Sequence, residues 1–174
     1  IPFTSNNASA VRVSNNSGRT TIGGFDDPTA VNLIGGSSVA GIYLDNAAGG
    51  SVVGNNIIGF QTNGLDPASN QIGVYLFNSP GNYLIYNYIA NSNATGITIS
   101  GAASTGNILQ YNRIGVDWTG GIPGNQGAGI ALNFAAGNNA VGAPFNGDYG
   151  GNFIARSVGP GVWISPSGGS GNRV

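Results

Sequence analysis

The stretch Gly73-Val74-Tyr75-Leu76 is followed 23 residues later by Gly96-Ile97-Thr98-Ile99, and both stretches follow one pattern. A small residue comes first, and two aliphatic residues then flank one variable residue. The pattern occurs six times along the chain: Ala10-Val11-Arg12-Val13, Gly41-Ile42-Tyr43-Leu44, Gly73-Val74-Tyr75-Leu76, Gly96-Ile97-Thr98-Ile99, Gly129-Ile130-Ala131-Leu132 and Gly161-Val162-Trp163-Ile164. The starts are 31, 32, 23, 33 and 32 residues apart. Self-similarity at a period of about 20 to 50 residues predicts a solenoid.

Two aliphatic residues on either side of one variable residue indicate a strand with one buried face. We expect the aliphatic pairs to point inward: Val11/Val13, Ile42/Leu44, Val74/Leu76, Ile97/Ile99, Ile130/Leu132 and Val162/Ile164. The residue between each pair varies from arginine to tryptophan, which is what an outward position allows. Each repeat therefore contributes one strand to a stack of similar strands.

A second strand is predicted after a turn in each repeat. The turn often contains a Gly-Asn pair, and these two residue types tolerate the left-handed conformation of sharp corners. The pairs are Gly81-Asn82, Gly106-Asn107, Gly137-Asn138 and Gly171-Asn172. An aliphatic residue follows the turn: Val53, Leu84, Leu109, Val141 and Val174.

A third phrase consists of asparagine, any residue, isoleucine, and then glycine or alanine. It begins at Asn32, Asn56, Asn87, Asn112 and Asn152. In a parallel stack these five side chains lie above one another, and we expect them to hydrogen-bond as a ladder. Each coil then has about three short strands. The shortest coil runs from Gly73 to Gly96, and longer coils carry extra residues that we place on the third side: Phe60–Gln71, Val116–Gln126 and Ala143–Gly151, with the extra residues of the first coil near Gly24–Ala30.

The composition excludes several classes of function. The chain has 174 residues and forms one predicted domain, 1–174. Its charge rests on five Arg and six Asp, and Cys, His, Met, Lys and Glu do not occur. The commonest general bases, metal ligands and nucleophilic thiols are therefore missing. We expect no catalytic residues, no metal site and no cofactor. A net charge of −1 predicts no nucleic-acid partner, and no apolar run is long enough for membrane insertion.

The Gly-Asn corners with their following aliphatic residues, and the loop of residues 114–125, resemble the right-handed parallel β-helix repeats of secreted bacterial proteins. The resemblance covers almost the whole chain. It implies an all-β fold, a single-stranded right-handed parallel β-helix of about six coils, in which no capping elements are recognised. It also implies an extracellular or cell-surface location. It leaves function open, because lyases, hydrolases, adhesins, tailspikes and structural fibres share this fold.

Two alternatives come from surface residues. The six carboxylates are Asp26, Asp27, Asp45, Asp66, Asp117 and Asp148, and all except Asp45 lie in long loops. Paired carboxylates serve glycoside hydrolysis, but Asp27, Asp66 and Asp148 sit in ordinary turn sequences such as Asp-Pro. Tyr43 and Tyr75 occupy equivalent positions in adjacent coils, which favours cross-strand packing. Contact with carbohydrate surfaces is the other interpretation of the aromatic residues.

The two ends of the sequence match each other. Residues 3–13 parallel residues 89–99, so the chain starts on a third strand, and it stops on a second strand. The coil starts lie near residues 10, 41, 73, 96, 129 and 161, and joining two copies places the next start 23 residues after Gly161, the length of the shortest coil. We expect residues 1–9 to complete a coil of a neighbouring subunit. The predicted assembly interface comprises Ile1, Phe3, Val11, Val13, Val162, Ile164 and Val174.

The sequence therefore predicts a structural subunit of an extracellular filament, with copies of itself as its partner in a head-to-tail homopolymer. The alternative is a fragment of a larger secreted β-helix, either an adhesin or a polysaccharide-active lyase or hydrolase. A carbohydrate-binding module is a further possibility.

Overall fold

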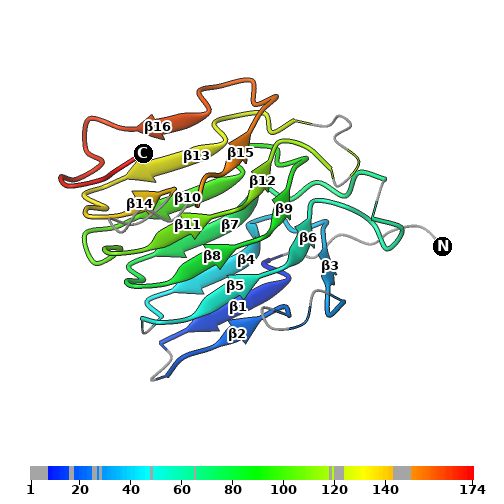
Figure 1. Cartoon of the computed structure of the whole chain (residues 1–174), viewed down its shortest axis with the longest axis horizontal. Coiled ribbons are helices and arrows are strands. Elements are labelled where there is room, and N and C mark those ends of the chain that lie inside the picture. Colours follow the sequence, from blue (N-terminus) through cyan, green and yellow to red (C-terminus); the bar gives the residue numbers. More distant parts are fainter. Residues whose placement is uncertain are drawn as a thin grey trace.

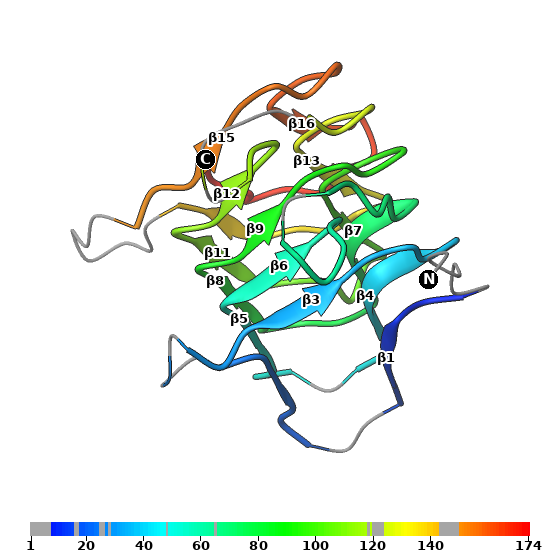
Figure 2. The same ribbon diagram turned by 90° about the vertical axis from the view of Figure 1, so that its right-hand side faces the viewer.

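Three parallel sheets wind around one aliphatic core in the computed structural model of the chain (Figure 1). The structure describes residues 8–15, 18–24, 27, 29–47, 49–64, 66–117, 119, 124–142 and 150–174. Within these ranges there are sixteen strands and no helix. Figure 2 shows the stack from the side, with the coils following one another from the first strands to the last.

Each of the first five coils supplies one strand to each sheet in turn, and the sixth supplies β16 to the first sheet. The first sheet contains β1 (Val11–Ser14), β4 (Ala40–Asp45), β7 (Ile72–Phe77), β10 (Ile97–Ser100), β13 (Ile130–Asn133) and β16 (Val162–Ile164). The second contains β2 (Thr21–Ile22), β5 (Val52–Gly54), β8 (Tyr83–Ile85), β11 (Ile108–Gln110) and β14 (Ala140–Val141). The third contains β3 (Asn32–Ile34), β6 (Asn56–Ile58), β9 (Tyr88–Ile89), β12 (Arg113–Ile114) and β15 (Phe153–Ile154). This order is the predicted parallel β-helix of about six coils.

The predicted inward pairs form two columns of the core. Ile42 pairs with Val74, Ile97 pairs with Ile130, and the same register continues to the first and last strands. The pairs of the four middle coils are fully buried. Val11, Val13 and Val162, at the two ends of the first sheet, pack against this core but are only partly buried. The period-2 pattern thus predicted the buried face correctly.

The small residue that opens each repeat has a steric cause. A Cβ atom added at Gly96 would lie 2.9 Å from Cγ2 of Ile114 and 2.7 Å from the carbonyl oxygen of Gly129. At Gly73, a Cβ would lie 2.5 Å from Cγ2 of Ile89. The isoleucine of each third strand therefore fills the space that a side chain would need at the start of the first strand of the same coil.

The long connections occupy two corners, and our placement of all of them on the third side was wrong. Residues 59–71 and 115–129 connect the third sheet to the first, as predicted. Residues 142–152 instead connect β14 to β15, between the second and third sheets, and residues 23–31 connect β2 to β3 at the same corner. Repeat spacing counts extra residues in a coil, but it does not say at which corner they are inserted.

Candidate functional site

The last coil exposes the core at one end of the stack. Ile164 is 41% exposed and Val174 is 78% exposed, whereas Leu132, which pairs with Ile164, is fully buried. A hollow of about 380 Å³ lies at this end, lined by Val141, Gly142, Gly151, Asn152, Ile154, Arg173 and Val174. Figure 1 shows β16 at the top of the stack, and no described element covers it. We call this surface the open end.

Main-chain donors point towards the open end in a repeated pattern. The N–H of Val74 donates to the carbonyl of Gly96 at 2.9 Å, and the N–H of Ile97 donates to that of Gly129 at 2.9 Å. The N–H of Ile130 continues the series by donating to Gly161, also at 2.9 Å. Val162 is the next member. Its N–H faces the position that a further coil would occupy, so the open end is an edge on which another strand can pair.

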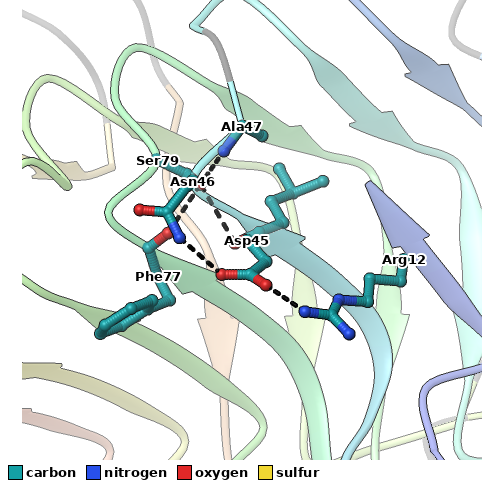
Figure 3. Close-up of polar contacts among 7 residues, drawn as sticks. Arg12, Asp45, Asn46, Ala47, Phe77 and Ser79 are labelled. Atoms are coloured by element: carbon teal, nitrogen blue, oxygen red, sulfur yellow. Dashed lines mark hydrogen bonds and ion pairs between the residues drawn. The ribbon is translucent and has the colours of Figure 1, made fainter. Parts of the chain in front are cut away.

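The opposite end of the first sheet is formed by β1, and Figure 3 shows its polar contacts. The guanidinium of Arg12 forms an ion pair with Asp45 of the next coil and lies 5.4 Å from the ring centre of Tyr43. The hydrogen bond to Asp45 raises the pKa of Arg12, and partial burial raises the pKa of Tyr43. The second oxygen of Asp45 accepts from the side chain of Asn46 at 2.8 Å. This pair anchors the first coil to the second.

The predicted asparagine ladder is present between the second and third sheets. The amide nitrogen of each member donates to the amide oxygen of the next at 2.9 Å, through Asn32, Asn56, Asn87, Asn112 and Asn152. Asn87 is typical: its oxygen also accepts the main-chain N–H of Asn56 at 3.1 Å, and its nitrogen also donates to the carbonyl of Val53 at 2.8 Å. Every polar atom of this buried amide is therefore paired.

A second ladder, which the sequence analysis missed, lies between the first and second sheets. Its members are Ser51, Asn82, Asn107, Asn139 and Asn172. Three belong to Gly-Asn pairs that we interpreted only as left-handed corners, and Gly81, Gly106 and Gly171 do have positive φ. In the fifth coil Asn138 takes the left-handed position (φ 54°) and Asn139 joins the ladder. The spacing of these asparagines by one coil length could have predicted the second ladder.

The third corner carries a column of alternating serine and asparagine: Ser37, Asn70, Ser92, Asn125 and Ser157. The amide oxygen of Asn70 accepts the N–H of Ser37 at 3.0 Å, and that of Asn125 accepts the N–H of Ser92 at 3.0 Å. The three serine hydroxyls and the two asparagine nitrogens have no hydrogen-bond partner among the described residues. This corner is therefore less completely paired than the other two.

Aromatic side chains stack along the outer surfaces. The rings of Tyr43 and Tyr75 lie 4.9 Å apart and nearly parallel, as predicted for cross-strand packing. Tyr86 and Tyr111 form a second stacked pair, 5.0 Å apart, and both are exposed. In the third sheet, the guanidinium of Arg113 lies between two rings of the neighbouring coils. It is 5.6 Å from the ring centre of Tyr88 and 5.3 Å from that of Phe153. We call this arrangement the arginine sandwich.

The described loop carboxylates are separated and bonded within their own turns. Asp27 accepts hydrogen bonds from the N–H and hydroxyl of Thr29, which lower its pKa, and Asp117 accepts the same two bonds from Thr119. Asp66 accepts from the side chain of Asn63 at 2.7 Å. Asp27 lies at the corner between the second and third sheets, whereas Asp66 and Asp117 lie between the third and first. Among the residues that the structure describes, no three His, Cys, Asp or Glu side chains gather as for a metal ion.

Several predicted positions lie outside the described residues. Of the assembly interface these are Ile1 and Phe3, together with residues 1–7 of the segment expected to complete a neighbour's coil. Of the carboxylates they are Asp26 and Asp148. The remaining interface positions lie at the two ends of the stack: Val11 and Val13 on β1, Val162 and Ile164 on β16, and Val174 beside the hollow.

The part of the chain that the structure describes contains no helix long and apolar enough to cross a membrane. Comparisons of this chain with protein-family models, with curated proteins and with solved structures found no match.

Proposed function

We propose that this chain is a structural subunit that stacks head to tail on further copies of itself to form an extracellular β-helix filament. The observation that carries the proposal is the match between the two ends of the first sheet. β16 ends the sheet with the N–H of Val162 facing onward, and β1 begins it with Val11 and Val13 in the same columns of the core. A second copy placed on the open end continues the main-chain pairing and the aliphatic columns without a change of register.

The open end also provides the driving force. Ile164 and Val174 are exposed there, and Val141 and Ile154 line the hollow beside Val174. Covering these residues removes apolar surface from water and satisfies the strand edge at the same time. Because the two contacting surfaces differ, each added copy presents a new open end, and growth does not close into a ring.

Light scattering and negative-stain microscopy of the purified chain test the proposal. We expect species that grow with concentration and appear as thin, unbranched filaments. Ile164→Lys should raise the concentration needed for assembly by more than about a hundredfold, because stacking would bury an unpaired charge. Tyr83→Lys is the matched control, since Tyr83 has nearly the same exposure, 45%, on β8 in the middle of the stack. A monodisperse monomer at high concentration would contradict the proposal and favour a piece of a longer β-helix.

Exposed tyrosines favour carbohydrate contact as a second candidate function. Tyr86 and Tyr111 lie at the corner between the second and third sheets, and Tyr83 begins β8 of the second sheet; the three are 38% to 47% exposed. Aromatic rings with a polar edge suit the mixed apolar and polar faces of sugars. Retention of the chain on insoluble polysaccharide, lost in the double variant Tyr86→Ala with Tyr111→Ala, would support this function. Retention that the variant leaves unchanged would argue against it.

A further inference from the structure

Arg12 and Trp163 occupy the same outward column of the first sheet, at its opposite ends. The register pairs Arg12 with Tyr43, Tyr43 with Tyr75, and Ala131 with Trp163. The intervening coils place Thr98 in this column. Arg12 uses one ring, that of Tyr43, and its side chain remains 58% exposed. Trp163 is 45% exposed. The column thus begins with a half-covered cation and ends with a half-exposed indole ring.

The arginine sandwich of the third sheet is a complete version of the same arrangement. Arg113 pairs in register with Tyr88 on one side and with Phe153 on the other. Both rings lie within 6 Å of its guanidinium carbon, the distance range of a favourable cation–π contact. The coil spacing of about 4.8 Å therefore accommodates a guanidinium between rings of the preceding and following coils.

We infer that stacked copies are set in register by an intermolecular arginine sandwich, in which Arg12 of one copy lies between its own Tyr43 and Trp163 of the preceding copy. This inference rests on the proposed head-to-tail stacking and names the contact that orients it. In this register Val11 faces Val162 and Val13 faces Ile164. A slip of one residue would turn the aliphatic side chains outward. A slip of two residues would place Arg12 beside Gly161 or Ser165, which carry no ring.

The chain contains no cysteine, so an engineered pair reports the register directly. Ser14 follows Arg12 and Val13 on β1, and Ser165 follows Ile164 at the open end. Within one chain the two serines lie five coils apart, roughly 24 Å at the usual strand spacing, which is too far for a disulfide. The double variant Ser14→Cys with Ser165→Cys should therefore give a ladder of covalent multimers on a non-reducing gel. The pair Ser14→Cys with Trp163→Cys, which would lie side by side only after a slip of two residues, should not.

The role of the indole ring is tested in the cysteine-free chain. Trp163→Leu keeps an apolar side chain but removes the ring, and it should raise the concentration for half-maximal assembly about tenfold. Trp163→Phe should restore most of the loss. Arg12→Lys should weaken assembly as well, because an ammonium lacks the planar face of a guanidinium. The double variant Trp163→Leu with Arg12→Ala should need no higher concentration for half-maximal assembly than the more severe of its two single variants, because both changes remove the same contact. Phe134→Leu, at an aromatic that is 69% exposed on the fifth coil, is the control and should have no effect.

The outcomes separate the two proposals. If the unmodified chain does not associate, the head-to-tail function and this inference both fail. If it associates but only the shifted cysteine pair cross-links, or Trp163→Leu assembles like the unmodified chain, the arginine sandwich is overturned while stacking stands.

Discussion

The corner between the second and third sheets and the corner between the third and first sheets differ in how completely their polar side chains are hydrogen-bonded. Both turn the chain sharply, and both bury a column of polar side chains beside the aliphatic core. At the first of these corners, five asparagines in successive coils are joined by hydrogen bonds between their side-chain amides. In the second, serine alternates with asparagine, and five side-chain groups lack partners within the described chain.

The two corners show that the ladder depends on consecutive asparagines. An amide has an acceptor oxygen and a nitrogen with two donors, so each asparagine can bond to the coil before it and the coil after it. A serine hydroxyl is shorter and carries one proton. Between Asn70 and Ser92 the series of side-chain contacts is interrupted, although the two residues pair as a parallel bridge. Removing a side chain should therefore have a larger effect in the complete ladder than in the alternating column.

Asn87→Ala should have the largest effect. It deprives the main-chain and side-chain N–H groups of Asn56 of their acceptor and the carbonyl of Val53 of a donor. Leaving such groups buried and unpaired should lower the free energy of unfolding by about 3 kcal/mol. Urea unfolding followed by circular dichroism measures the change. Asn93→Ala, at an exposed asparagine of the same coil, is the control and should stay within about 0.5 kcal/mol of the unmodified chain.

Gly96→Ala should destabilise the third corner by about 1–3 kcal/mol, because the added methyl group overpacks it. The new Cβ would lie 2.8 Å from the amide nitrogen of Asn125 and 2.9 Å from Cγ2 of Ile114. Thermal unfolding compared with Gly18→Ala gives the measurement, since a Cβ at Gly18 has no neighbour within 4 Å. Equal melting temperatures for the two variants would mean that the corner yields to the extra methyl group.

Asn125→Ala should lower stability by about 1 kcal/mol, clearly less than Asn87→Ala. Only the N–H of Ser92 loses its side-chain acceptor, and an amide nitrogen without a partner is removed at the same time. Parallel urea titrations of the two alanine variants give the ratio directly. If both variants lost the same stability, the contrast between the two corners would be wrong.

Ser92→Asn should have the smallest effect and the opposite sign. It creates three successive asparagines with Asn70 and Asn125, which allows the amide groups to bond in series as they do around Asn87. We expect a gain of a few tenths to about 1 kcal/mol, measured as a rise in melting temperature. Ser37→Asn is the matched comparison at the end of the column. A loss of stability at position 92 would show that space beside Gly73, and not the hydroxyl, limits this corner.

The number of coils, the inward-facing residues and one ladder could be predicted from the amino-acid sequence. Each of these follows from a short-range pattern that repeats: two aliphatics around one variable residue, or Asn-x-Ile with a small residue after it. Stacking in register converts such a pattern into columns, so Asn87 must lie between Asn56 and Asn112 once the coils align. No long-range information beyond the repeat was needed.

The corner that received each insertion, the choice between Asn138 and Asn139 for the second ladder, and the described polar groups that lack a partner became known only from the folded chain. These outcomes depend on contacts between coils of unequal length, where local spacing no longer identifies equivalent positions. The pairing of Arg12 with Asp45 and the two rings around Arg113 are of the same kind, because each joins residues more than 20 positions apart. A repeat specifies what faces inward, while the neighbouring coils determine what each outward or corner side chain meets.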